Sequence, residues 1–158
     1  MTDWDLEMTL GEAQEMLRPL IWEPKGAICP LCHQHAQVYK WTLYSTAVRL
    51  LAELYKAGGT EKLVEAKRVK PTGSQGDGAR LRYYGLAESD KDRRPDGGKS
   101  GWWQVTEFGR AFLFDRAVVR KNVWVYDNRV MRREGPPVRV RDALGKKFNY
   151  DEMMRGTL

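Results

Sequence analysis

The sequence predicts an α+β fold, and three observations support this class. The stretch "WTLYSTAVRLLAELYKAGG" carries apolar residues at helical spacing, and "VWVYDNRVMR" alternates like a β-hairpin. Between them, two short strand patterns enclose the glycine-rich stretch "SDKDRRPDGGKSG". With 158 residues, 42% of them hydrophobic, the chain is long enough to bury one core. We therefore predict an arm over residues 1–41, a main domain over 42–116, and a hairpin with a short helix over 117–158.

The arm begins with a predicted amphipathic helix in "TLGEAQEMLRPLI". Thr9 suits the capping position at its start, and Pro24 and Gly26 follow its end. We expect the helix to serve as an arm or as a first docking helix. Its predicted apolar stripe consists of Leu10, Ala13, Met16, Leu17 and Leu20.

The main domain begins with the clearest helical pattern in the chain. This helix ends at Gly58-Gly59, a favourable stop, and its apolar face consists of Ala47, Val48, Leu51, Leu54 and Tyr55. Pro71 and Gly73 interrupt the segment that follows. We therefore predict a short strand or turn near Leu63 and a short helix over residues 65–69.

A further helix is predicted from Gln75 to Tyr84, ended by Gly85. Its two glycines cost about 1 kcal/mol each relative to alanine, so packing must hold it. A helical wheel turns Leu81 and Tyr84 inward and Arg82 to the flank, and the outward positions are Gln75, Gly76, Ala79, Arg80 and Tyr83. Small residues beside Arg, Gln and Tyr suit close approach to a nucleic-acid groove, and they equally suit a solvated helix face.

Two strands, residues 86–88 and 102–105, are predicted to pair beneath a protruding loop, because the stretch between them is too long for a tight hairpin. Strand alternation places Trp103 and Val105 on one face, so we expect Trp103 to anchor the loop in the core and Trp102 to lie at the surface. Thr106 then suits the cap of a helix with an inward stripe of Phe108, Ala111 and Phe112.

The C-terminal part predicts a hairpin around Asp127-Asn128, whose two-residue turn pairs Val125 with Val130 and Trp124 with Met131. A short helix follows, for which Asn149 is a suitable cap. This part either extends a basic surface or serves dimerisation or partner docking.

The stretch "RLRYYGLAESDKDRRPDGGKSGWWQVTEFGRAFL" resembles the core of a winged helix-turn-helix domain of the MarR, PadR and ArsR type. The resemblance covers about residues 45–114 and is most specific at Gly85-Leu86 and in "VTEFGRAFL". It implies that the helix over residues 75–84 lies in the DNA major groove. The charged loop between the two predicted strands, called the wing, then reaches phosphates or the adjacent minor groove. The DNA-binding residues that follow from it are Gln75, Arg80, Arg82, Tyr83, Arg93, Arg94 and Lys99.

The only two cysteines of the chain lie in "CPLCHQH", which resembles a zinc knuckle in its spacing. A closed zinc site normally takes its other two ligands from a second, distant pair, and the chain has only His33 and His35 to offer. A site built on Cys29, Cys32 and His35 therefore needs a carboxylate or a residue from another subunit. The alternative is a degenerate knuckle with two partly buried thiols.

No motif favours an enzyme. "GGKS" at residues 97–100 ends like a phosphate-binding loop, but Arg93 occupies the position of its first glycine. Both histidines lie beside the cysteines, so the chain offers few residues from which a Ser-His or Cys-His catalytic pair could be built. We expect a binding protein.

Charge is unevenly distributed. Residues 1–28 contain six acids and two bases, a net charge of −4, whereas residues 29–158 contain 25 bases and 15 acids, a net charge of +10. The basic part suits double-stranded DNA, and RNA stays open because tyrosines and tryptophans stack on single strands. The sequence offers no apolar run of about 20 residues and only two closely spaced cysteines, so we expect a cytoplasmic protein without a membrane partner.

The leading hypothesis is double-stranded DNA binding by a bacterial or bacteriophage transcriptional regulator, as a monomer or a homodimer. The alternative is a winged-helix interaction module. Such a module docks on a host or viral protein of replication, transcription or defence without touching DNA, because a fold alone does not determine a function.

Overall fold

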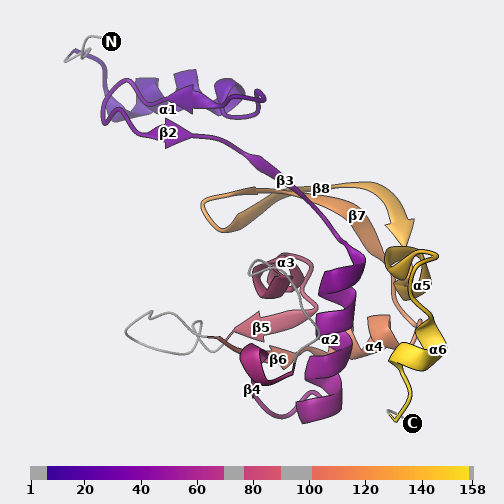
Figure 1. Ribbon diagram of the computed structural model, residues 1–158. Helices are drawn as coiled ribbons and strands as arrows, with labels where there is room; N and C mark the ends of the chain where they lie inside the picture. Colours follow the sequence, from indigo (N-terminus) through magenta and orange to yellow (C-terminus); the bar gives the residue numbers. More distant parts are fainter. Residues whose placement is uncertain (1–6, 70–76, 90–100, 157–158) are drawn as a thin grey trace. The chain divides into compact units, whose positions relative to one another are not determined.

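The computed structural model describes residues 7–69, 77–89 and 101–156, and their fold is α+β (Figure 1). The chain divides into two compact units: Met1–Lys40 with Trp124–Arg132, and Trp41–Val123 with Arg133–Leu158. The first division falls between Lys40 and Trp41, and residues 117–158 are shared between the two units.

The first unit contains helix α1 (Leu10–Leu20) and a small hairpin of β1 (Ala27–Ile28) and β2 (His35–Ala36). Thr9 caps α1 as predicted: its hydroxyl accepts a bond from the backbone N–H of Glu12, whose carboxylate accepts one from the N–H of Thr9. The register pairs Ala27 with Ala36.

The predicted apolar stripe of α1 is only partly buried. Ala13 is buried and Leu17 packs against a small core of Ile21, Ala36 and Val38. The prediction is wrong for three residues of the stripe, because this core is too small to cover them; Leu10, Met16 and Leu20 are 75%, 39% and 41% exposed.

The second unit is built around α2 (Ser45–Gly58), which stops where predicted but begins four residues after Trp41, the first residue of the predicted helical stretch. Ala47, Val48, Leu51 and Leu54 are fully buried, as predicted from their spacing. Tyr55 lies at the edge of this face, with its ring edge-on to Phe114 at 5.6 Å between centroids. The helix ends at Gly59, whose φ is +57°.

A second sheet follows α2, with strand order β4-β6-β5. Its antiparallel register pairs Val64 with Trp103 and Ala87 with Val105. Strand β6 matches its predicted bounds and β5 begins one residue later than predicted. The elements of this segment are β4 (Val64–Glu65), the 3-10 helix η1 (Ala66–Arg68), α3 (Asp77–Tyr83), β5 (Ala87–Ser89) and β6 (Trp102–Val105).

Gly85 follows the end of helix α3, and its left-handed φ of +73° allows two closing hydrogen bonds. The N–H of Gly85 donates to Arg82 O and the N–H of Leu86 donates to Leu81 O, the pattern of a Schellman motif. Thr106 then donates its hydroxyl hydrogen to Gly85 O at 2.6 Å. The end of α3 is therefore fixed to the start of the next helix.

Helix α4 (Glu107–Leu113) is capped by Thr106, as predicted, through a bond of 2.9 Å from the N–H of Gly109. The inward position predicted for Phe108 is wrong, since Phe108 is 43% exposed. Gly109 faces inward instead, because a Cβ at that position would lie 2.1 Å from Leu86 O. The close approach of two backbones thus rotates the helix relative to the predicted stripe, while Phe112 stays buried.

The third sheet has the order β3-β7-β8 and includes the predicted C-terminal hairpin. Both residues of its turn, Asp127 and Asn128, have positive φ (+49° and +61°), which is typical of a type I′ turn. Asn149 caps α6 as predicted. The remaining elements are β3 (Tyr39–Thr42), β7 (Val119–Tyr126), β8 (Arg129–Val138), α5 (Val140–Leu144) and α6 (Tyr150–Met153). Among the described helices, none is long and apolar enough to cross a membrane.

Candidate nucleic-acid interface

Arg80, predicted to face outward from α3, is held inside the second unit. Its Nη1 lies 2.9 Å from Asp77 Oδ1, and its guanidinium lies 5.0 Å from the ring centroids of both Trp41 and Tyr44. Its side chain is 14% exposed and that of Asp77 is fully buried. The outward orientation predicted for Arg80 is therefore wrong, and the residue links α3 to the segment before α2.

Tyr83 is also buried, at 9% exposure, where an outward side chain was predicted. Its ring meets Trp41 at 5.5 Å between centroids and an angle of 62°. The helical wheel assumed one buried face, but α3 packs on both sides: against α2 and against aromatic side chains that lie far away in the sequence. Ala79 and Arg82 remain partly exposed.

The wing residues Arg93, Arg94 and Lys99 lie outside the described residues, as does Gln75. The base of the wing is described, because β5 and β6 pair up to Ser89 and Trp103. The N–H of Ala66, at the start of η1, donates to Gly101 O at 2.8 Å. The segments that enter α3 and leave the wing are therefore joined at one end of the sheet.

Two cations that the sequence reasoning did not select lie at this junction. Lys67 and Arg68 of η1 are exposed, and Arg68 pairs with Glu65 at 3.0 Å. Both belong to the cationic run "KRVK", which precedes the helix of interest. That run was a signal available in the sequence, but only the bond between Ala66 and Gly101 places Lys67 and Arg68 near the start of β6.

The two neighbouring tryptophans divide their roles as predicted. Trp102 is 40% exposed, whereas Trp103 is half-buried on the same strand as the buried Val105. A Cβ at Gly78 would lie 2.6 Å from Trp103 Cε2, so the indole rests directly on the backbone of α3. This contact explains why α3 tolerates a glycine and how it is held.

Tyr84 fastens the end of α3 to the rest of the second unit. Its hydroxyl lies 2.6 Å from Lys121 O and 3.2 Å from Trp41 O, and its single hydrogen is donated to the nearer of these carbonyls. Burial raises the pKa of Tyr84 far above its ordinary value of about 10. The group therefore stays neutral and acts as a structural donor.

In the first unit, the segment "CPLCHQ" forms a tight turn between β1 and β2. The N–H of Cys29 donates to Gln34 O at 2.8 Å, and the N–H of His33 donates to Cys29 O at 2.9 Å. His33 adopts a left-handed φ of +59°. Hydrogen bonds from the backbone N–H groups of Cys32 and Leu31 hold the pKa of the Cys29 thiol below its usual range.

The three metal ligands predicted in this segment are not brought together. Cys29 and Cys32 are not disulfide-bonded, and His35 Nε2 lies 2.7 Å from Lys25 O. Within the described ranges, no three His, Cys, Asp or Glu side chains converge on one point. His35 therefore does not complete a site with the two cysteines in the structure.

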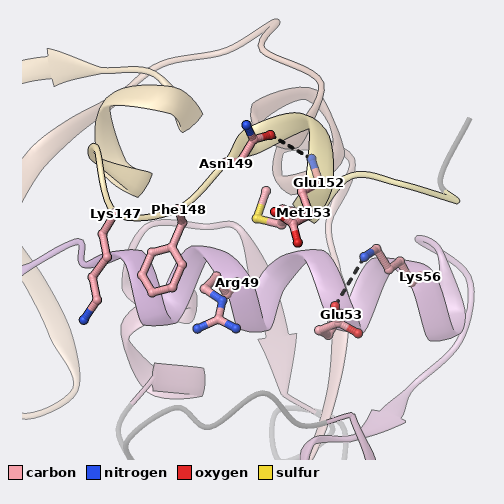
Figure 2. A pocket seen from close by; sticks show the side chains of 8 residues that line it. All are labelled: Arg49, Glu53, Lys56, Lys147, Phe148, Asn149, Glu152 and Met153. Carbon is pink, nitrogen blue, oxygen red and sulfur yellow. Dashed lines mark hydrogen bonds and ion pairs between the residues drawn. The ribbon is translucent and has the colours of Figure 1, made fainter.

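A cleft of about 280 Å³ lies between α2 and the segment that carries α6 (Figure 2). The Arg49 guanidinium stacks 4.4 Å from the Phe148 ring centroid, and Lys56 pairs with Glu53 at 3.3 Å. The cleft is small for a ligand pocket and mixes both signs of charge. Its lining residues are Arg49, Glu53, Lys56, Lys147, Phe148, Asn149, Glu152 and Met153, none of which is a strong nucleophile.

Comparison of the chain with models of protein families, with curated proteins and with solved structures finds no match.

Proposed function

We propose that residues 42–116 form a winged-helix domain that binds double-stranded DNA, as in a bacterial or bacteriophage transcriptional regulator. The observation that carries the proposal is the connection of the β4-β6-β5 sheet: α3 directly precedes β5, and the charged stretch 90–100 joins β5 to β6. The order predicted from the sequence, helix, helix-turn-helix, strand, wing, strand and helix, supports the proposal, and β4 is an additional short strand after α2.

The basic groups near this end of the sheet support duplex binding. Lys67 and Arg68 are exposed beside the base of the wing, and Arg82 is partly exposed on α3. The wing adds four bases within residues 90–100. We assign phosphate contacts to these cations, with Gln75 as a base-reading residue. Arg80 and Tyr83 position α3 from within.

The test is duplex binding measured against salt for the wild type and for Arg93→Glu with Arg94→Glu. Removal of two phosphate contacts lowers the slope of log K against log salt by about 2 and weakens binding at every salt concentration. The matched control is Lys146→Glu with Arg155→Glu, the same change of charge at exposed positions near the C-terminus. If both double variants weaken binding equally, binding depends on net charge alone, and the proposed interface is contradicted.

The second candidate is a winged-helix module that docks on a protein of replication, transcription or defence. The exposed apolar residues Leu10, Met16 and Leu20 of α1 favour it, because such residues on one helix are typical of a docking face. A mobility-shift assay with mixed-sequence duplex separates the two candidates. Absence of any shift at low salt favours the docking module.

A further inference from the structure

The cysteine-containing turn of the first unit has the backbone geometry of a metal-binding knuckle. Its β-hairpin closes with bonds from Cys29 N to Gln34 O and from His33 N to Cys29 O. His33 holds the left-handed φ that lets the chain reverse directly after the second cysteine. The N–H groups of Leu31 and Cys32 point at the Cys29 sulfur. This arrangement holds the two cysteine side chains on one turn, with Cys32 exposed.

One chain supplies only half of the ligands that a closed zinc site requires. Structural zinc is held tetrahedrally by four cysteine or histidine ligands. The chain has two cysteines in total, and His35 is turned to the carbonyl of Lys25. In the part of the chain that the structure describes, no third ligand joins the pair. A second polypeptide with the same turn can supply the missing ligands.

We propose that two copies of this chain share one zinc ion through Cys29 and Cys32 of each. A twofold axis through the metal makes the two cysteine pairs equivalent. The turn of each copy then supplies the two ligands that the turn of the other copy lacks. On binding, the four thiols release four protons and form four Zn–S bonds, which leaves a net charge of −2 on the centre. Residues 24–40 contain Lys25 and Lys40 and no acid.

The apolar surface beside the turn fits the same occupant. Ile28, next to Cys29, is 49% exposed on β1. A symmetric mate carries the same exposed Ile28 next to its own Cys29. Burial of these two side chains adds hydrophobic stabilisation to the bond energy of the metal.

The experiment is a titration of the full-length, reduced protein with Co²⁺ and then Zn²⁺, followed by light scattering to measure mass. The proposal expects half a metal ion per chain, the absorption bands of tetrahedral cobalt with four sulfur ligands, and a doubled mass that a chelator reverses. A 1:1 complex on a monomer, or no binding at micromolar metal, would overturn it.

Two variants and one measurement on the wild type complete the test. Cys29→Ser with Cys32→Ser abolishes both metal binding and the mass change, whereas His35→Gln leaves the stoichiometry at one half. Loss of the half-stoichiometry in His35→Gln contradicts a site made of four thiolates. Because the serine variant can lose its fold, alkylation of the wild type provides an independent check: one zinc ion per two chains protects both cysteines, and unprotected cysteines contradict the proposal.

Discussion

At the scale of single residues, Arg80 shows how a side chain that looks suited to DNA can belong to the interior. Its guanidinium lies over two aromatic rings, 5.0 Å from each centroid, and pairs with the buried Asp77. A planar cation that pairs and stacks at once is a role that lysine does not reproduce. Arg80 therefore affects the binding of a ligand only by positioning α3.

We predict that Arg80→Met destabilises the protein by about 3–5 kcal/mol, because it leaves the Asp77 carboxylate buried without its cation. Asp77→Asn combined with Arg80→Met recovers part of the loss, and Arg80→Lys falls between the wild type and Arg80→Met. Denaturant unfolding measures all of these variants. A stable Arg80→Met variant that binds duplex poorly would instead assign Arg80 to the DNA surface.

Tyr84 gives a prediction for pH. Burial raises its pKa in the folded state above the ordinary value of about 10, so the folded state holds the phenolic proton more tightly than the unfolded state does. This contribution is complete below about pH 10 and is lost as the pH rises further. Stability of the wild type should therefore fall more steeply above pH 10 than that of Tyr84→Phe.

The same variant should lose about 1 kcal/mol at pH 7 with the hydrogen bond to Lys121 O. Burial also raises the pKa of Tyr150, but this group is present in both proteins and cancels in the difference. Thermal unfolding between pH 8 and 11.5 provides the comparison. Parallel curves for the two proteins would show that Tyr84 titrates without effect on folding.

At the scale of elements, α4 is placed by the approach of its backbone to that of Leu86. Alanine normally stabilises a helix by about 1 kcal/mol relative to glycine. At Gly109 the added Cβ would lie 2.1 Å from Leu86 O, so we predict a net loss of about 2 kcal/mol. Gly11→Ala, at an exposed position of α1 where the added Cβ would meet only Thr9 Oγ1 at 3.9 Å, is the matched control and should not destabilise.

Thermal unfolding of both glycine variants decides the point. The diagnostic quantity is the difference between the two substitutions, since each carries the same gain in helix propensity. If Gly109→Ala and Gly11→Ala unfold at the same temperature, the close approach of α4 to Leu86 is not what positions the helix.

Elements with strong local signals were predictable from the sequence. Periodic apolar residues gave α2, Thr106 gave the start of α4, and Asp127-Asn128 gave the hairpin turn. Strand β3 was missed, because the alternation of Tyr-Lys-Trp-Thr extends over only four residues and is too short to distinguish a strand. The rotation of Phe108 was also missed, since it depends on a contact with Leu86 more than twenty residues away.

The candidate site was less predictable for the same reason. The pattern on α3 identified cationic and aromatic residues but not their orientation, which Trp41 and Tyr44 determine from before α2. Lys67 and Arg68 join the site only through the bond between Ala66 and Gly101. In the cysteine-containing segment, the spacing indicated a zinc knuckle, whereas the ligand set required knowledge of where His35 points.

At the scale of the whole molecule, the two proposals combine into one prediction. A zinc-linked pair of chains carries two winged-helix domains, so it should protect two half-sites of duplex where a single chain protects one. Footprinting with zinc and with a chelator measures the length of protected DNA. We expect about a twofold extension with zinc, which Cys29→Ser with Cys32→Ser abolishes. A footprint whose length ignores zinc would separate DNA binding from the metal.

The contact between Gly78 and Trp103 also provides a spectroscopic reporter. The indole rests on the α3 backbone itself, with no side chain in between, so any displacement of that helix changes the surroundings of the ring. A fluorine atom on the Trp103 ring, assigned by substitution to phenylalanine, gives a resonance that follows this displacement directly. Trp102 on the adjacent, more exposed position supplies an internal reference for changes in solvent alone.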